Sequence, residues 1–455
     1  MKPTTRRTFL TTTAMATTAA TTGCSGVAGF APPSRGKVRG NPFANVKEIP
    51  ESEARTPSER YPPPFDAQEY ATRLTRCRET MSKIGVDLLW TGWPDSMLYL
   101  HGYEMTWYSP SRNPRMGTAI HVDHDKQIFL GGEEFIFSAA KDRRPLRSQG
   151  GAGGTAKAVV EILKQEGWLK KGTVLGMEFE RYLPTPAVSR QLEAAFTDAG
   201  AKVVDATNVI GKVRNIKSPA EIAAFEQAAR IADIGIRAVA EMLEPGVTSA
   251  EIYGAAYYAM MKVGGEATAI PQAVQPGRPR STHLLPSRRQ IQAGESFAFD
   301  LAGVYKRYHA NLDRTFILGE PPAELVRMHS AAKGALDVLQ KTAKAGTPLA
   351  VVNRALREYY KKVDIWKFSD GPLGYELDAS LPPDWCGDFW FNVSNEQDDG
   401  RVFEANMVTN YETRFRLADP KAKFDLVCHA RDTLVYTPTG ARILSAIPCD
   451  LIVVG

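Results

Sequence analysis

Two short stretches of the chain combine residue types that can carry acid–base chemistry. The first runs from Pro276 to His283, and the second, from Asp300 to Phe316, contains Asp313 among polar and aromatic residues. An imidazole can donate or accept a proton near neutral pH, and neighbouring carboxylates orient its ring and favour its charged form. A histidine in a loop is by itself more often structural than catalytic, so the surrounding pattern has to decide between the two.

These stretches resemble the creatinase/aminopeptidase P superfamily when they are taken together with three others. Met407–Glu412 and His429–Asp432 match the family patterns M-V-x-x-x-E and R-x-E-D, and Arg214–Glu221 matches R-x-I-K-S-P-x-E. The resemblance covers nearly the whole chain apart from an N-terminal leader. It implies an α/β N-terminal domain followed by an α+β pita-bread C-terminal domain, and a homodimer, since family members are usually dimers.

Metal-bearing members of this superfamily hold two divalent ions with two Asp on one strand, a Gly-flanked His and two Glu on later strands. By the family patterns, Asp300 and Glu412 keep two of these positions, whereas Asn311, Pro372 and Arg431 occupy the other three. Asn is a weak neutral ligand, Pro offers no donor, and Arg brings a positive charge to the former ion site. The resemblance therefore implies catalysis without a metal, with Arg431 between Asp300 and Glu412; two bound divalent ions are the alternative.

Creatinase, the metal-free branch of the superfamily, gives the closer match. In creatinase a catalytic His precedes the motif strand, an acid comes directly before Arg-Thr, and a Glu follows on a later strand. The matching residues are His283, Asp313 and Glu412. The resemblance implies that His283 activates water and protonates the leaving group, while the two carboxylates hold a cationic or hydrogen-bond-donating group. Arg112 matches the residue by which the partner subunit of creatinase binds the substrate carboxylate.

Each of these roles has a structural alternative. Asp313 could form a local ion pair with Arg314, and Glu412 could pair with Arg414 or Arg431. Asp300, without metal partners, could line the pocket or make a structural hydrogen bond. These alternatives stay open at the level of sequence.

The aromatic-rich segment from Pro382 to Phe391 departs from the family pattern, which usually has His-Glu-x-Pro nearby. It is either a surface loop that anchors itself with aromatic side chains or an apolar pocket wall for a substrate larger than creatine. On the second interpretation the substrate is not creatine itself. The residues that we expect to bind the substrate are Arg112, Trp107, Tyr108, Asp300, Arg431, Trp385 and Trp390.

Three functions follow from this pattern. The first is a creatinase-like hydrolase that cleaves a C–N bond, or another carbon–heteroatom bond, of a small molecule. The second is a metalloenzyme of the same superfamily, either a Xaa-Pro dipeptidase or aminopeptidase or a lyase resembling dimethylsulfoniopropionate lyase. The third is a non-catalytic protein that keeps the fold and binds a ligand, in which replacement of His283 would leave binding intact.

The elements that position these residues fall into two domains, 66–210 and 211–455, behind a linker or arm at 32–65. In the first domain, apolar spacing from Tyr70 to Ile84 predicts a helix, followed by helices at 155–167 and 186–199. Strands are expected at 86–90, 117–122, 127–130, 173–177 and 202–205. In the second domain Ser218, with Pro219 and Glu221, forms a capping-box pattern that opens a helix over 219–242.

The remainder of the second domain alternates between strands and helices. Thr248 and Ser249 cap a helix that ends near Gly264, strands occupy 267–318, helices 320–363 and strands 404–453. Four cysteines follow the leader without a CxxC spacing, and they are expected to be buried small residues rather than zinc ligands.

Residues 1–31 are expected to be a processed leader. Arg6-Arg7-Thr8-Phe9-Leu10, followed by a Thr/Ala-rich run, is a twin-arginine signature, which predicts export of the folded protein to the periplasm. Cys24 is a candidate lipid anchor. The first 40 residues contain Lys and Arg but no acid and account for the net charge of +5, so no nucleic-acid partner is implied.

Overall fold

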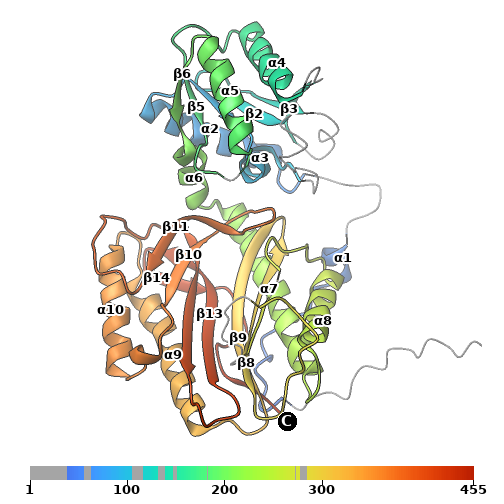
Figure 1. The fold of residues 1–455 in the computed structure, drawn as a ribbon, viewed down its shortest axis with the longest axis vertical. Coiled ribbons are helices and arrows are strands. Elements are labelled where there is room, and N and C mark those ends of the chain that lie inside the picture. Colours follow the sequence, from blue (N-terminus) through green and yellow to red (C-terminus); the bar gives the residue numbers. More distant parts are fainter. Residues whose placement is uncertain are drawn as a thin grey trace, which may run out of the picture. The chain divides into compact units, whose positions relative to one another are not determined.

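The computed structural model describes residues 38–55, 63–104, 116–131, 139–146, 151–181, 183–271, 273–276 and 284–455. Within these ranges the chain forms two sheets (Figure 1). A six-stranded sheet has the order β4-β3-β2-β1-β5-β6, and a nine-stranded sheet has the order β11-β10-β12-β13-β9-β8-β7, with β14 on β13 and β15 on β9. The predicted fold class, an α/β N-terminal domain and a pita-bread C-terminal domain with a curled antiparallel sheet, is confirmed.

The first sheet is mixed, because β1 pairs with β2 antiparallel and with β5 parallel. Its strands are β1 (Leu88–Thr91), β2 (Gly117–His121), β3 (Gln127–Gly131), β4 (Asp142–Pro145), β5 (Val174–Met177) and β6 (Lys202–Asp205). The helices around it are α2 (Ala67–Ile84), α3 (Pro94–His101), α4 (Gly151–Gln165), α5 (Pro186–Asp198) and α6 (Thr207–Asn215), after a short α1 (Glu51–Ala54).

The second sheet is antiparallel except for β15, which runs parallel to β9. Its strands are β7 (Ala273–Pro276), β8 (Ser296–Tyr305), β9 (Tyr308–Leu318), β10 (Leu373–Leu377), β11 (Cys386–Asn392), β12 (Val408–Leu417), β13 (Leu426–Thr437), β14 (Gly440–Ile443) and β15 (Ile452–Val454). The helices are α7 (Pro219–Met242), α8 (Ser249–Lys262), α9 (Ala323–Thr342) and α10 (Leu349–Lys362).

Helix α7 begins and ends where its sequence signals predict. The Ser218 hydroxyl accepts a hydrogen bond from the Glu221 amide, and the Glu221 carboxylate accepts one from the Ser218 amide, which completes the capping box. Thr248 caps α8 in the same way with Glu251. Hydrogen bonds within a single turn therefore determine where the helices α7 and α8 begin.

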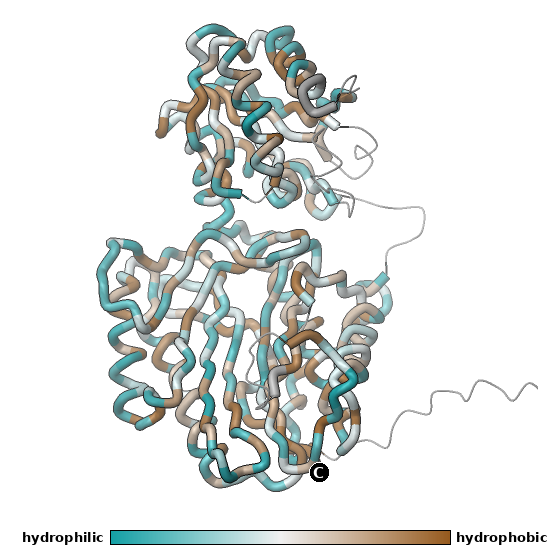
Figure 2. Tube along the Cα trace, in the orientation of Figure 1, coloured by the Kyte–Doolittle hydropathy of each residue, from teal (hydrophilic) through white to brown (hydrophobic). Residues whose placement is uncertain are grey.

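The second sheet has two faces of opposite character. Leu312 and Phe316 of β9 pack on α7, and Ala430 and Leu434 of β13 pack on α9; we call this side the helix face. Because successive side chains of a strand alternate between faces, the residues between them point the other way. This second side, the polar face, carries Asp300, Asn311, Asp313, Asn410, Glu412, His429 and Arg431. Hydrophobic and hydrophilic residues both occur along these strands (Figure 2).

A two-residue turn between β8 and β9 sets the register of the polar face. Lys306 and Arg307 have φ of 51° and 67°, the left-handed values that a tight hairpin turn requires. Side chains other than glycine resist this conformation, but both backbone amides donate to the Glu266 carboxylate, at 2.7 and 2.9 Å. The resulting register places Asp300 directly opposite Asp313.

The structure decides against one of the two interpretations of the aromatic segment. The segment is not a surface loop throughout, because Cys386–Asn392 forms the edge strand β11 paired with β10. Its residues alternate, with Phe389 and Phe391 in the core and Trp390 exposed. Cys77, Cys428 and Cys449 are buried free thiols, as expected of small core residues. Among the described helices, each is too short or too polar to cross a bilayer.

Candidate functional site

The centre of the polar face is a buried cluster of charges. Arg431 of β13 lies opposite Glu412 of β12 in the strand register. Its guanidinium pairs with Glu412 Oε2 at 3.0 Å and, through its other terminal nitrogen, with Asp300 of β8. Burial alone would lower the pKa of Arg431, but the negative charges of Asp300 and Glu412 raise it well above its ordinary value. Arg431 is therefore a permanent cation between two carboxylates, in agreement with the prediction.

Two buried amides complete the binding of these carboxylates. Asn311 Nδ2 donates to Asp300 Oδ1 at 2.7 Å, and Asn410 Nδ2 donates to Glu412 Oε1 at 3.0 Å and to Asn311 Oδ1 at 3.1 Å. Among the described residues, each carboxylate thus has at least one charged and one neutral donor. Sequence reasoning gave Asn410 no role, although its position two residues before Glu412 on the same strand places it on the same face.

Asp313 forms a second pair, with His429, a residue to which the sequence gave no role. His429 Nδ1 lies 3.1 Å from Asp313 Oδ2, and both side chains are buried. Within the part of the chain that the structure describes, Asp313 Oδ1 has no hydrogen-bond partner. The alternative of a local ion pair with Arg314 does not hold, since that guanidinium pairs with Asp432 at 3.0 Å.

The two tryptophans of the aromatic segment have different environments. Trp385 is buried, and its Nε1 donates to the Tyr375 hydroxyl at 3.3 Å. Trp390 is 43% exposed and stands on β11 directly opposite Tyr375 of β10. Tyr375 and Trp390 belong to the same side of the sheet as Glu412, because Leu373, two residues before Tyr375, is paired with Glu412.

Several predicted residues fall outside the described ranges. They are the proposed acid–base residue His283, the substrate residues Trp107, Tyr108 and Arg112, and the leader residues Arg6, Arg7 and Cys24. Their roles stay predictions. The structure therefore brings together Asp300, Asp313, Glu412 and Arg431, with Trp390 on the same face.

Two family patterns match consecutive parts of this chain. Residues 73–216 match the Creatinase/Prolidase N-terminal domain, and residues 223–443 match Metallopeptidase family M24. The ectoine hydrolase of Halomonas elongata is 26% identical over 419 residues, which are 86% of this chain and 98% of that protein. The Xaa-Pro dipeptidase of Pyrococcus furiosus is 25% identical over 246 residues, 54% of this chain and 67% of that protein.

The chain belongs to the creatinase/aminopeptidase P superfamily. Within it, the chain is a hydrolase of the M24 family. Solved structures share the fold: the X-Pro aminopeptidase from Thermotoga maritima has a TM-score of 0.69 at 18% identity over 84% of this chain and 99% of that one. The N-terminal domain of the FACT complex subunit SPT16 from chickpea has a TM-score of 0.65 at 12% identity, over 84% and 97%.

The family implies a pair of divalent ions, and the side chains on the polar face do not fit them. Asp300 and Glu412 stand at two positions that hold metal ligands in the family, and both carry carboxylates. Both carboxylates are bound by Arg431, which itself stands at a third ligand position. Asn311 donates its amide to Asp300 rather than offering a second carboxylate. Among the described residues no group of three or more His, Cys, Asp or Glu side chains is arranged to hold a metal.

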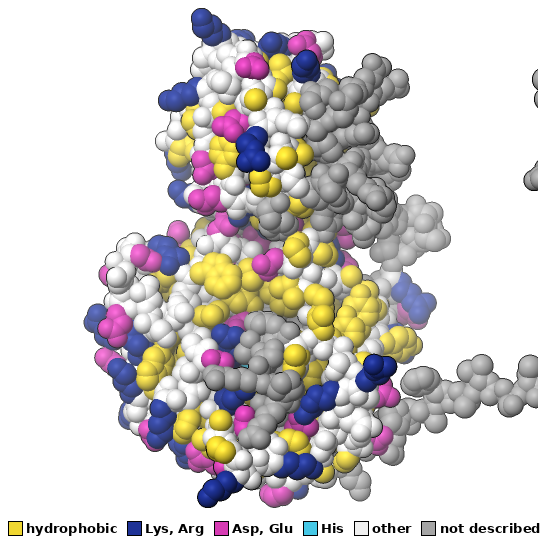
Figure 3. Space-filling model, in the orientation of Figure 1, with side chains coloured by type: hydrophobic (Ala, Val, Ile, Leu, Met, Phe, Trp, Pro, Cys, Tyr) yellow, Lys and Arg dark blue, Asp and Glu magenta, His cyan; other side chains and the backbone are white. Residues whose placement is uncertain are grey.

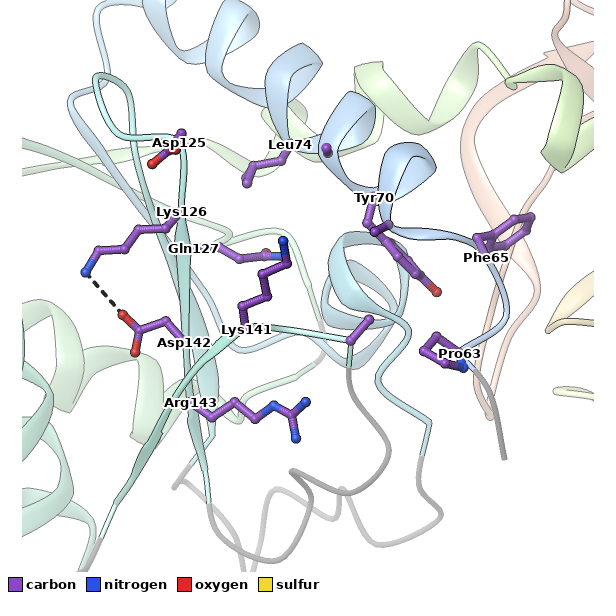
Figure 4. Close-up of a pocket in the computed structure, with 13 residues that line it drawn as sticks. Pro63, Phe65, Tyr70, Leu74, Asp125, Lys126, Gln127, Lys141, Asp142 and Arg143 are labelled. Carbon is purple, nitrogen blue, oxygen red and sulfur yellow. Dashed lines mark hydrogen bonds and ion pairs between the residues drawn. The ribbon is translucent and has the colours of Figure 1, made fainter. Parts of the chain in front are cut away.

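A separate cavity of about 710 Å³ lies in the N-terminal domain between α2 and strands β3 and β4 (Figure 4). Two of its lining residues form an ion pair, since Lys126 Nζ lies 3.1 Å from Asp142. None of the predicted catalytic residues lines it. We therefore place the candidate active site on the polar face of the second sheet and not in this cavity.

Proposed function

We propose that the chain hydrolyses a C–N bond, or another carbon–heteroatom bond, of a small molecule by metal-independent, creatinase-like acid–base catalysis. The observation that carries this proposal is the pairing of Arg431 with Asp300 and Glu412. A guanidinium neutralises these carboxylates as a metal would, but it cannot lower the pKa of a bound water as a metal does. Water then has to be activated by a side chain.

His283 is the group proposed for that proton transfer. It accepts a proton from the attacking water and returns it to the leaving nitrogen. Asp313 and Glu412 hold the cationic or hydrogen-bond-donating part of the substrate. His429 binds Asp313 through Oδ2, which among the described contacts leaves Oδ1 for the substrate. Arg112 is proposed to bind an anionic group of the substrate.

The relatives supply the first substrates to test. The match to ectoine hydrolase extends over most of both chains, and the match to the Pyrococcus furiosus dipeptidase extends over 54% of this chain. Ectoine, creatine and a Xaa-Pro dipeptide therefore form a panel that separates the three kinds of hydrolase. Hydrolysis is followed by mass spectrometry of the products, with the metal content of the same protein measured by elemental analysis.

We expect the chain to hydrolyse a non-peptide substrate, and we expect this activity to persist after the protein is dialysed against a chelator. Replacing His283 by Ala should lower kcat/KM by about 10²-fold or more. His124→Gln is the matched control, because His124 is an exposed histidine of the N-terminal domain. About two bound ions per chain, together with loss of turnover in chelator, would overturn the proposal in favour of a metallopeptidase. Unchanged turnover in His283→Ala would remove that residue from the mechanism.

A further inference from the structure

The cavity of the N-terminal domain has one apolar wall and one polar wall. Its volume of about 710 Å³ lies in the range of small-molecule sites in proteins. Helix α2 supplies the apolar wall through the buried side chains of Tyr70 and Leu74. Gln127 of β3 and Lys141, directly before β4, belong to the polar wall. A molecule that fills this cavity therefore needs an apolar body and a polar end.

The side-chain amide of Gln127 is satisfied at one end only. Its Nε2 donates to the Leu100 carbonyl at 3.1 Å, which fixes the orientation of the amide. Gln127 is only 9% exposed, and within the described part of the chain its Oε1 has no hydrogen-bond partner. Leaving a buried acceptor unpaired is unfavourable, and such groups are rare in folded proteins. Gln127 Oε1 is therefore suited to accept a hydrogen bond from an N–H group of a ligand.

Lys141 brings a positive charge to the same cavity. Figure 4 shows the side chains of Lys141 and Gln127 pointing into the cavity towards α2. Among the residues that the structure describes, no carboxylate pairs with Lys141, whereas the nearby Lys126 and Asp142 pair with each other. Charges of both signs are interspersed over the face of the N-terminal domain seen in Figure 3. The attraction for an anion is therefore local to the cavity and does not come from a general positive surface.

We propose that this cavity binds a small carboxylate with an apolar body and an N–H group next to the carboxylate, as in an N-acyl derivative of an apolar α-amino acid. The carboxylate pairs with Lys141, the N–H donates to Gln127 Oε1, and the apolar side chain packs on Tyr70 and Leu74. A neutral N–H fits better than the ammonium of a free amino acid, because Lys141 would repel a second positive charge. The inference goes beyond the proposed function, since none of these residues lies on the polar face.

Three small probes separate the proposed contacts. N-acetyl-L-phenylalanine has all three groups, N-acetyl-L-phenylalaninamide lacks the negative charge, and hydrocinnamate lacks the N–H. In isothermal titration calorimetry of the full chain, N-acetyl-L-phenylalanine should bind about 5-fold more tightly than its amide, since an accessible ion pair contributes modestly. It should bind about 10-fold more tightly than hydrocinnamate, which leaves the Gln127 acceptor unpaired.

Two variants locate these contacts within the cavity. Lys141→Met should weaken the binding of N-acetyl-L-phenylalanine by about 5-fold and leave that of its amide unchanged. Gln127→Leu should weaken N-acetyl-L-phenylalanine by about 10-fold and leave hydrocinnamate unchanged. Lys157→Met is the matched control, because Lys157 is an exposed lysine of α4 that does not line the cavity.

Equal binding of the three probes, or no measurable binding of N-acetyl-L-phenylalanine, would overturn the proposal. Binding that is unchanged in both Lys141→Met and Gln127→Leu would also overturn it, because the probe would then occupy another part of the chain. If circular dichroism shows that Gln127→Leu does not fold, Lys141→Met and the three probes on the unaltered chain still decide, since Lys141 is exposed. These measurements involve no turnover, so they test the cavity separately from the hydrolase activity.

Discussion

The two faces of the second sheet each bury an arginine–carboxylate cluster, and the two clusters differ in what else the arginine binds. Arg314 and Arg431 stand on neighbouring strands, and both are buried. Arg314, on the helix face, pairs with Asp432 and donates to three backbone carbonyls, those of Asp313, Arg431 and Ile447. Among the residues that the structure describes, the guanidinium of Arg431, on the polar face, pairs with carboxylates alone, and these come from two other strands.

This difference separates a structural from a functional use of the same residue types. Backbone carbonyls cannot move without unfolding the strand, so Arg314 connects β9, β13 and the C-terminal segment as one fixed unit. Carboxylate side chains can exchange one cation for another, and Arg431 therefore occupies a site whose partners are also suited to metals or to a cationic substrate. Buried charge alone does not identify an active site; the chemical type of its partners does.

The largest effect that tests this comparison is expected from Arg314→Met. Removing one partner of a buried pair leaves the Asp432 carboxyl group and three backbone carbonyls without their donor, which should lower the free energy of unfolding by about 3–5 kcal/mol. Urea unfolding followed by circular dichroism measures it. Arg442→Gln is the control, because Arg442 and Glu226 form an exposed pair at 2.6 Å that is expected to contribute about 0.5 kcal/mol. Equal losses in the two variants would contradict the structural role of Arg314.

Arg431→Met should also destabilise the chain, by about 3 kcal/mol, since it leaves Asp300 and Glu412 facing each other without a cation. The two variants should differ in their response to ions. Millimolar Mn²⁺ or Ca²⁺ is expected to raise the melting temperature of Arg431→Met, because a cation that binds only the folded state stabilises it. Arg314→Met should show no such recovery. An identical response of both variants to the ions would mean that the polar face has no special affinity for cations.

Local signals explain why much of the fold could be predicted from sequence. The first turn of α7 follows from Ser218, Pro219 and Glu221, which act within one turn of each other. The pairing of Arg431 with Glu412 could also be anticipated, because the family patterns fix which strand positions face the site. These inferences depend on neighbours in sequence or on a known pattern.

The features that sequence reasoning missed depend on pairing between distant strands. The strand β11 was not predicted, and the choice between a surface loop and a pocket wall stayed open, because an edge strand is defined by its partner, β10, rather than by its own residues. His429 received no role, since only the register of β13 against β9 brings it to Asp313. The contact between the tilted rings of Trp390 and Tyr375 likewise follows from cross-strand pairing. The sequence shows which residues alternate along each strand, but it does not show which residue of the next strand lies beside them.

The smallest effect concerns a buried histidine far from the polar face, His101 of the N-terminal domain. Its Nε2 lies 2.8 Å from the Thr118 hydroxyl, and burial lowers its pKa to about 3, against about 6.5 for an exposed ring. Above pH 6.5 neither the folded nor the unfolded state protonates this ring. Between pH 6.5 and 3 the unfolded state takes up a proton that the folded state does not, so stability is lost as the pH falls.

At pH 5 this contribution amounts to about 2 kcal/mol. His101→Gln, which keeps a polar group near Thr118, should therefore lose less stability than the unaltered chain between pH 7 and pH 5 in urea unfolding. Tyr258→Leu, a substitution at an exposed position that removes no imidazole, should behave like the unaltered chain. The same slope in all three proteins would show that His101 is not held neutral. A difference confined to His101→Gln would mean that the buried imidazole of His101 stays uncharged in the folded state.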